Sequence, residues 1–449
     1  MYIKKNFFLF GTLVLIITSC NGLVSNEMIS EATESFTVNN YRLSIEEAQQ
    51  NVLNFVAEMD KPEEGTITKR SKIARTIKNV EIFGKNNIAT YSSTDETNAL
   101  LSEIISAVDV DTLFYFINFD GNQGFAIHSA DKRSSIIYAV IDEGNMNMEK
   151  FKKTDNPGFI MFMENVIEIE KKLIESFDPV NTYAGAPPQT IGGYQLLAKV
   201  TPILKTKWGQ NNNYGTNYGQ RCPNLIAGCA ATAMAQLLSH YQIYNNITYF
   251  DPSQNTNFSI SLNWNQIISD SESLTPFYGG LSGITHSTSS YQVAHFMYYL
   301  GLQFSTVYNF NPNSSSTNVS NIINWLNSNP NLLPEVYTYF YQADYAAAFI
   351  RAGYLVYMTG SGTDNNGTLV GHAWIIDGYL YYAMMTNTMY YAHCNWGWHG
   401  DCDGYYYGSV FNMTSCDDPD CFTDIIDKIA SKSGLVLNNS FTSIFVRKK

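Results

Sequence analysis

The chain has 449 residues, of which 27 are basic and 40 acidic, so its formal net charge is −13. A nucleic-acid-binding protein needs a basic surface, and this acidic balance argues against that class. Apolar residues make up 45% of the chain and charged residues only 15%, so most of the chain can fold. Because single cores rarely serve chains longer than about 250–300 residues, we expect about two domains.

The first 20 residues have the features of an export signal. Lys4 and Lys5 precede the apolar run 7–17, which is too short to span a bilayer core of about 30 Å as a helix. Small residues come directly before Cys20, as in bacterial lipoproteins, whose cysteine is lipidated and becomes the new amino terminus. We therefore expect residues 1–20 to be a lipoprotein-type signal, with a lipid on Cys20 as the only membrane attachment. The expected location is the outer membrane, the periplasm or the cell surface, with release after processing; an ordinary secretory signal is the alternative.

Residues 21–180 are predicted to form a first domain that contains both helices and strands. Ser44 and Glu47 have the spacing of a capping box, which marks the start of a helix. Runs of β-branched and aromatic residues predict the strands. The predicted elements are a helix at 44–59, strands at 113–119, 124–129 and 135–140, and a helix at 156–177. This pattern is typical of a compact α+β unit.

The composition changes at 181–199, where glycine and proline are frequent and apolar periodicity is lost. Pro187 and Pro188 lie in this stretch, which we interpret as an exposed linker. Exposed linkers are preferred sites of proteolytic cleavage, so the same stretch is the predicted activation site. The second domain is predicted to occupy residues 200–449.

Cys229 is the first candidate for chemistry. It follows Gly228 and opens the run 229–238, in which small and apolar residues recur at helical spacing. A cysteine at a helix amino terminus faces unpaired amides and the positive end of the helix dipole, both of which favour the nucleophilic thiolate. The alternative is a buried structural cysteine among alanines.

His372 is the second candidate. It starts an aromatic and β-branched strand, 372–378, that follows a glycine-rich loop. A histidine beside a thiolate can hold it as an ion pair and later protonate the leaving amine. His372 follows Cys229 by 143 residues, which is within the range of papain-type pairs. Taken alone, a histidine in a strand is more often a packed side chain than a catalytic one.

Three further residues could complete such a site. Asn395 follows His372 by 23 residues, and an amide oxygen can fix the direction of an imidazole ring. The neighbouring Trp396 could screen that hydrogen bond from water. The side chain of Gln210 and the backbone amide of Cys229 could donate to the oxyanion of acyl transfer. The alternative for Asn395 and Trp396 is a turn with packing aromatics.

Two histidines and two cysteines lie close to Asn395 in the sequence and are residue types that can bind a metal. His393, Cys394, His399 and Cys402 could bind zinc, but their spacing fits no familiar zinc motif and Asn395 lies among them. A disulfide or free thiols are the favoured interpretation, and we expect no metal and no cofactor. Asp377 is a weaker rival to Asn395 as the residue that orients His372. Cys416 and Cys421 could form a disulfide, as could Cys394 and Cys402. The pairing stays open for Cys222, Cys394, Cys402, Cys416 and Cys421.

Together these motifs resemble the streptopain family of cysteine peptidases, which includes interpain-like enzymes of Bacteroidetes. The resemblance rests on residues 208–210, 228–236, 371–373 and 395–398, and a looser likeness at 124–133 matches the pro-domain of that family. The resemblance implies an α+β chain with a papain-like catalytic domain preceded by a smaller α+β inhibitory pro-domain.

The resemblance also implies roles for single residues. Cys229 would be the nucleophile, His372 the general base and acid, and Gln210 the oxyanion donor, while Asn395 would orient His372 and Trp396 would screen it. The expected function is an exported or lipid-anchored cysteine endopeptidase that is made as a zymogen and hydrolyses proteins or peptides. Its own pro-domain would be its inhibitor. A Cys-His-Asn acyltransferase or transglutaminase-like enzyme, and a non-enzymatic surface adhesin or inhibitor of the same fold, are the alternatives.

Overall fold

A computed structural model describes eleven stretches of the chain and divides it into two units by its internal contacts, Met1–Arg42 and Leu43–Lys449. The predicted signal falls in the first unit, outside the described residues, and the fold below is that of the second. No described helix is both long and apolar enough to cross a membrane. The described stretches are 41–61, 74–84, 112–177, 194–210, 226–273, 288–308, 315–333, 335–363, 369–384, 387–412 and 440–448.

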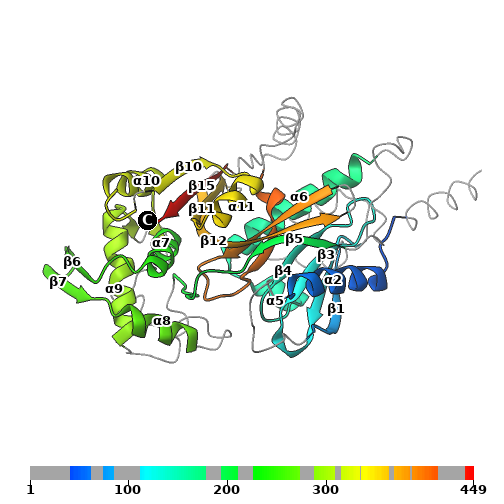
Figure 1. Cartoon of the computed structure of the whole chain (residues 1–449), viewed down its shortest axis with the longest axis horizontal. Coiled ribbons are helices and arrows are strands. Elements are labelled where there is room, and N and C mark those ends of the chain that lie inside the picture. Colours follow the sequence, from blue (N-terminus) through cyan, green and yellow to red (C-terminus); the bar gives the residue numbers. More distant parts are fainter. Residues whose placement is uncertain are drawn as a thin grey trace, which may run out of the picture. The chain divides into compact units, whose positions relative to one another are not determined.

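The amino-terminal part of this unit has the helices and strands expected from the sequence, together with a strand at 77–83 and a short helix at 148–153 that were not predicted (Figure 1). Ser44 accepts from the Glu47 amide and Glu47 accepts from the Ser44 amide, so the predicted capping box is confirmed. Asn156 caps the second long helix with its side-chain oxygen, and Pro157 occupies the first turn. The elements are α2 (Ile45–Met59), β1 (Ile77–Phe83), β2 (Phe114–Phe119), η2 (Asp120–Asn122), β3 (Phe125–Ser129), β4 (Ile137–Ile141), α5 (Met148–Lys153) and α6 (Pro157–Glu175).

The carboxy-terminal part begins with one strand and a group of helices, and then supplies most of the sheet. Its first elements are β5 (Gln195–Val200), α7 (Cys229–Tyr241), β6 (Asn246–Asp251), β7 (Thr256–Ser261), α8 (Trp264–Ser273), α9 (Thr288–Gln303), β8 (Val307–Tyr308), β9 (Ser315–Ser316) and α10 (Val319–Ser328). The remaining elements are β10 (Glu335–Phe340), α11 (Ala343–Arg351), β11 (Leu355–Thr363), β12 (Leu369–Met384), β13 (Asn387–Asn395), β14 (Gly404–Tyr407), η5 (Gly408–Phe411) and β15 (Ser440–Arg447).

One antiparallel sheet runs through both parts of the chain. Its strand order is β1-β2-β3-β4-β14-β13-β12-β11-β15-β10, and β5 pairs with β12 outside this path. The pairing of β4 with β14 is the point where strands from the amino-terminal part meet those from the carboxy-terminal part. Of the predicted linker 181–199, residues up to 193 lie outside the described residues, while Gln195 onward forms β5. The domain boundaries themselves stay a prediction.

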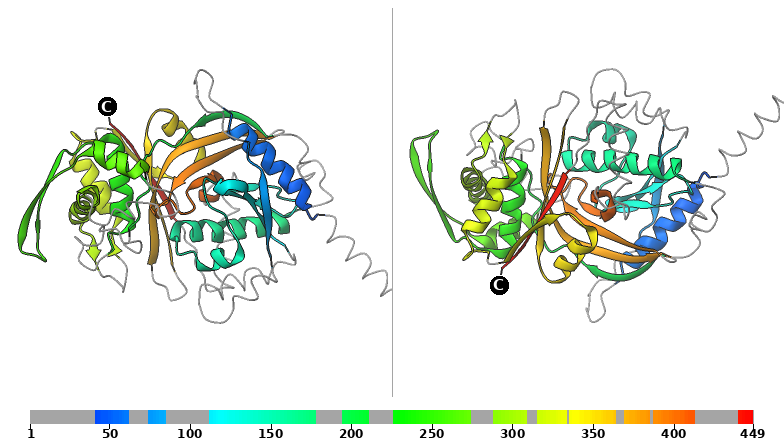
Figure 2. Two further views of the ribbon diagram at one scale, coloured as in Figure 1. Left: turned by 90° about the horizontal axis from the view of Figure 1, so that it is seen from below. Right: turned by 90° about the horizontal axis from the view of Figure 1, so that it is seen from above.

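The two faces of the sheet are covered by different helices, because successive side chains of a strand point to opposite faces. On β12, Trp374 and Ile376 belong to the core that contains the apolar side chains of α6. Ala373 and Ile375 belong to a second core, which contains α7 and α9. Figure 2 shows α6 and α7 on opposite sides of the central strands. This arrangement decides which side chains can meet Cys229.

Candidate active site

Cys229 is the first residue of α7, as the sequence predicted. Its predecessor Gly228 has a φ of 88°, in the left-handed region that glycine adopts without strain, and this turn directs the chain into the helix. The thiol is free and half-buried. Burial raises the pKa of the Cys229 thiol above its ordinary value, although the amides of Ala373, Ala230 and Cys229 itself act in the opposite direction. The thiol therefore lies beside the backbone of β12.

His372 lies within β12, opposite Gly360 of β11, rather than at the start of the strand. Its Nε2 lies 2.8 Å from the carbonyl oxygen of Trp396. A carbonyl can only accept, so Nε2 carries the proton and Nδ1 is left with the lone pair of a base. Nδ1 is buried and has no hydrogen-bond partner among the described residues. Burial lowers the pKa of His372 to about 4, against the opposing effect of the Trp396 carbonyl.

The thiol and the imidazole are not paired in this structure. Across the described stretches, no hydrogen bond joins Cys229 to His372. The ring of His372 stacks with Trp374 at a centroid distance of 6.2 Å, whereas the adjacent Ala373 packs in the core that contains α7. With a raised thiol pKa and an imidazole pKa near 4, both groups are neutral at pH 7.

Asn395 is the last residue of β13, and both the oxygen and the nitrogen of its side-chain amide form hydrogen bonds. Its Oδ1 accepts from Nε2 of Gln236 at 2.8 Å and from the Gly397 amide at 3.1 Å. Its Nδ2 donates to the carbonyl oxygen of Thr206 at 2.8 Å. None of these bonds reaches His372, so the orienting role expected of Asn395 stays a prediction.

Trp396 contacts His372 through its backbone as well as its ring. Its ring is fully buried and lies 6.4 Å from the imidazole, centroid to centroid. The indole nitrogen donates to the Cys402 carbonyl and to the Tyr406 hydroxyl, each at 3.0 Å. The Trp396 amide donates to Oδ1 of Asp403 at 2.9 Å, while its carbonyl accepts from His372. The backbone and the indole of Trp396 are therefore both held by hydrogen bonds to buried residues.

The segment that contains Gln210 lies against the turn that follows Asn395. Gly209 forms an antiparallel bridge with Trp398. A Cβ at Gly209 would lie 2.2 Å from Nε2 of His399, so a larger residue at this position would displace the His399 ring. The Gln210 carbonyl accepts from the Ala227 amide at 2.9 Å, two residues before Cys229. The structure thus brings the four predicted motifs into one region.

The start of α6 packs on the turn that carries Trp396. A Cβ at Gly158 would lie 2.1 Å from the Trp396 ring, so the helix backbone and the indole are in direct contact. Next to this contact, the indole nitrogen of Trp398 donates to Oδ1 of Asp155 at 2.8 Å. The amino-terminal part of the chain therefore contacts the residues that hold His372.

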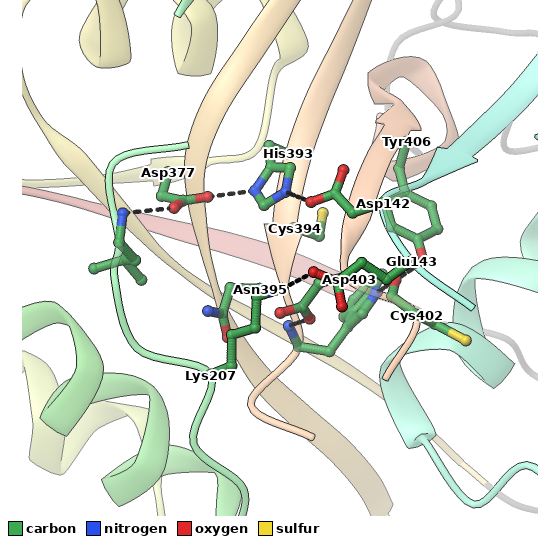
Figure 3. Close-up of polar contacts among 12 residues, drawn as sticks. Asp142, Glu143, Lys207, Asp377, His393, Cys394, Asn395, Cys402, Asp403 and Tyr406 are labelled. Carbon is green, nitrogen blue, oxygen red and sulfur yellow. Dashed lines mark hydrogen bonds and ion pairs between the residues drawn. The ribbon is translucent and has the colours of Figure 1, made fainter. Parts of the chain in front are cut away.

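A buried histidine joins the two parts of the chain at the β4–β14 junction (Figure 3). His393 lies between Asp377, at 2.5 Å from Nδ1, and Asp142, at 3.0 Å from Nε2. Burial alone would lower the pKa of His393, but the two carboxylates outweigh it and raise the pKa to about 10. Asp377 also accepts from the Leu204 amide at 2.9 Å. Asp377 is thus engaged with His393 and not with His372.

A second ion pair lies beside this histidine (Figure 3). Nζ of Lys207 is 2.9 Å from Oε1 of Glu143. Burial opposes the charge of Lys207, but Asp403 and Glu143 outweigh it and raise the pKa of Lys207. Asp403 is fully buried, and burial raises its pKa to about 7 even though Lys207 favours its charged form. Acidic residues of the amino-terminal part therefore neutralise cations beside the site.

The cysteines near the site are free thiols. Cys394 and Cys402 are buried and unbridged, so the disulfide between them that the sequence left open is absent. Within the described stretches, no group of three or more His, Cys, Asp or Glu side chains is placed to hold a metal ion. The other cysteines lie outside the described residues: Cys20, Cys222, Cys416 and Cys421.

Two buried polar residues at the site, Gln236 and Asp403, are not among the residues that the sequence predicts. Gln236 lies within the apolar run of α7, where a fully buried amide needs hydrogen-bond partners. That single feature could have drawn attention to it. Asp403 follows the motif by a few residues, and nothing local indicates that its carboxylate turns back to the Trp396 amide.

Comparisons with known proteins identify a family of peptidases. Residues 208–406 match the model of the Peptidase C10 family. Streptopain of Streptococcus pyogenes is 25% identical over 329 residues, which cover 65% of this chain and 73% of streptopain.

Two solved structures from Prevotella intermedia also align with the chain. A prointerpain A fragment aligns with 75% of this chain and 95% of its own, with 21% identity and a TM-score of 0.47. Active interpain A aligns with 56% of this chain and 95% of its own, with 21% identity and a TM-score of 0.36. The family match and the streptopain relatives assign residues 208–406 to the peptidase C10, or streptopain, family of cysteine peptidases.

Proposed function

We propose that this cysteine peptidase cleaves proteins or peptides through an acyl-enzyme on Cys229, with His372 as the base. The observation that carries the assignment is the hydrogen bond from Nε2 of His372 to the Trp396 carbonyl. It fixes the tautomer in which Nδ1 has a free lone pair, which is the form that a general base requires. The position of Cys229 in the first turn of α7 supports its assignment as the nucleophile.

In the proposed reaction, the proton of the Cys229 thiol moves to Nδ1 of His372, and Sγ bonds to the carbonyl carbon of the substrate. The Cys229 amide and the Gln210 side chain donate to the oxyanion that forms. The C–N bond then breaks, and the amine leaves with the proton from His372. Water attacks the thioester with His372 again as base, and cleavage of the C–S bond releases the acid and restores the thiol.

We further propose that the chain is made as a zymogen, with residues 21–180 as the inhibitory part. Three observations support this. The thiol and imidazole are neutral and unpaired while the amino-terminal part is attached. Gly158 of α6 packs against Trp396, whose carbonyl holds His372. Asp155 accepts from the Trp398 indole. Cleavage in the linker would release these contacts and let the turn bring His372 to Cys229.

Export is a separate proposal that rests on the sequence of residues 1–20. A lipid on Cys20 would anchor the precursor, and cleavage of the linker would free the catalytic part from that anchor. Labelling of growing cells with a fatty-acid probe tests this. The wild type should carry the label and fractionate with membranes, whereas Cys20→Ala should do neither. An unlabelled wild type would rule out the lipid anchor.

The catalytic assignment is tested with a thiol-directed epoxide inhibitor on the processed protein, followed by mapping of the modified peptide. We expect modification of Cys229 alone and loss of casein digestion, with no digestion by Cys229→Ala. Digestion that persists in Cys229→Ala would show that the nucleophile is wrong. Transfer of the acyl group to an added amine, without hydrolysis, would favour the acyltransferase. A processed protein that neither digests casein nor reacts at Cys229 would favour a binding protein.

A further inference from the structure

We propose that Gln236 is a positioning residue that holds the oxyanion segment and the turn behind His372 in register with the nucleophile helix. This inference rests on the proposed function, because it assigns a role in the same site. Its observation is a separate one, namely a closed set of hydrogen bonds around one fully buried amide.

The position of Gln236 in the helix puts its side chain near the site. Gln236 follows Cys229 by seven residues, which is about two turns of an α-helix, so both side chains lie on about the same face of α7. Oε1 of Gln236 accepts from the Trp208 amide at 2.9 Å. Nε2 of Gln236 donates to Oδ1 of Asn395 at 2.8 Å. One side chain therefore bonds to two segments that are far apart in the sequence.

Asn395 closes the network. Its Nδ2 donates to the Thr206 carbonyl at 2.8 Å, two residues before Trp208. Its Oδ1 also accepts from the Gly397 amide at 3.1 Å, which fixes the turn that follows. Gln236 and Asn395 are both buried, and a buried polar group that loses its partner costs free energy, so alternative arrangements are disfavoured. The network specifies one geometry.

Both segments that Gln236 holds carry groups of the proposed mechanism. Trp208 lies two residues before Gln210, the proposed oxyanion donor. Asn395 lies directly before Trp396, whose carbonyl accepts from His372. A displacement of about 1 Å at a reacting group can cost about 100-fold in rate. Loss of the Gln236 amide should therefore reduce the rate of the chemical step more than it weakens substrate binding.

The simpler alternative is that Gln236 only stabilises the fold. The chain offers a matched control in Gln292, a buried glutamine of α9 whose Oε1 accepts from the Asn263 amide at 3.0 Å. Replacing Gln236 or Gln292 by leucine leaves one backbone amide of a loop without its acceptor. Both variants should lose stability, and Gln236→Leu more, because it also loses its hydrogen bond to Asn395. Only the Gln236 variant should change catalysis if the residue is a positioning residue.

The experiment compares wild type, Gln236→Leu, Gln236→Glu and Gln292→Leu, each processed at the linker with the same added protease. Melting temperature, kcat and KM on a peptide, and the alkylation rate of Cys229 are measured at a temperature where all four are folded. We expect kcat of Gln236→Leu to fall about 10- to 100-fold with KM within about twofold. Gln292→Leu should melt earlier than wild type but keep its kcat.

Gln236→Glu provides the rescue test. A charged glutamate can still accept from the Trp208 amide but cannot donate to Asn395, so its kcat should be low at neutral pH. A protonated glutamate regains a donor, so kcat relative to wild type should rise as the pH falls. The positioning role is overturned if Gln236→Leu melts at a lower temperature than wild type but has the same kcat as Gln292→Leu. An inactive wild type would instead overturn the proposed function, and this inference with it.

Discussion

Asp142 accepts from Nε2 of His393 at 3.0 Å, and this contact joins β13 to the residue that directly follows β4. The histidine also contacts Asp377, so a cation is held between two acids at the junction of the two parts of the chain. Because its partners raise the pKa of His393 to about 10 and lower that of Asp142, the contact makes the precursor sensitive to pH.

The first prediction concerns the stability of the precursor against pH. A histidine whose pKa is raised on folding stabilises the fold fully below its ordinary pKa of 6.5, and this stabilisation is lost as the pH rises through about 10. We expect Asp142→Asn to lower the free energy of unfolding by about 1–3 kcal/mol near pH 6. The free energy of unfolding of this variant should also fall less than that of wild type between pH 6.5 and 10. Denaturant unfolding of the Cys229→Ala precursor at several pH values measures both.

Glu149 provides the control for that prediction. Its exposed ion pair with Lys153 lies in α5, so Glu149→Gln removes a carboxylate without touching His393. Exposed ion pairs contribute little to stability, so this variant should keep the wild-type dependence on pH. An unchanged pH dependence in Asp142→Asn would contradict the coupling to His393.

The second prediction concerns Asp403, whose Oδ1 accepts from the Trp396 amide. Its pKa is raised to about 7 from 3.8, so its charge destabilises the fold increasingly as the pH rises from 3.8 through about 7. Asp403→Asn keeps the acceptor and removes the charge. We therefore expect this variant to match wild-type stability near pH 4 and to exceed it by about 1–3 kcal/mol at pH 8.

Asp403→Ala tests the hydrogen bond rather than the charge. Alanine, like asparagine, removes the charge, but it also leaves the buried Trp396 amide without a partner, so Asp403→Ala should be less stable than Asp403→Asn by about 1–3 kcal/mol at every pH. Thermal unfolding of the three proteins at pH 4 and pH 8 separates the two effects. Equal stability of Asp403→Asn and wild type at pH 8 would show that the charge carries no cost.

The third prediction concerns Gly158, where a Cβ would lie 2.1 Å from the Trp396 ring. Gly158→Val should push the start of α6 away from the turn and raise the alkylation rate of Cys229 in the unprocessed chain. The readout is the intact mass of the precursor after timed exposure to iodoacetamide. Glu175 ends α6 far along the helix from this contact, and Glu175→Gln should leave the rate unchanged. A Gly158→Val precursor that reacts no faster than wild type would contradict the link between α6 and the site.

The fourth prediction concerns the pH dependence of thiol reactivity. In the precursor, burial raises the thiol pKa above 9.0 and lowers that of His372 to about 4, so no ion pair forms at neutral pH. Alkylation of Cys229 should therefore increase only at alkaline pH in the precursor. After processing, a plateau should extend to neutral pH, because a thiolate–imidazolium pair forms. Mass spectrometry follows both forms in one sample. A precursor with the same neutral plateau would show that the pair already exists.

The sequence alone determined the local features of this chain. The capping box at Ser44, the proline in the first turn of α6 and the start of α7 at Cys229 depend on residues close together in the chain. Side-chain chemistry and backbone preferences of neighbouring residues decide such features, so motifs at 208–210, 229, 372 and 395–396 could be recognised without coordinates.

Only the tertiary structure decided which side chains meet. The sequence predicts a hydrogen bond between Asn395 and His372. In the structure the Asn395 amide bonds to Gln236 and to two backbone groups, and the imidazole of His372 donates to the Trp396 carbonyl. His393 was weighed as a zinc ligand and instead joins two carboxylates, one of them from the amino-terminal part. The physical reason is that strand register and the face on which a side chain lies are set by pairing between residues more than 100 positions apart in the chain. Local preferences carry no information about such pairings.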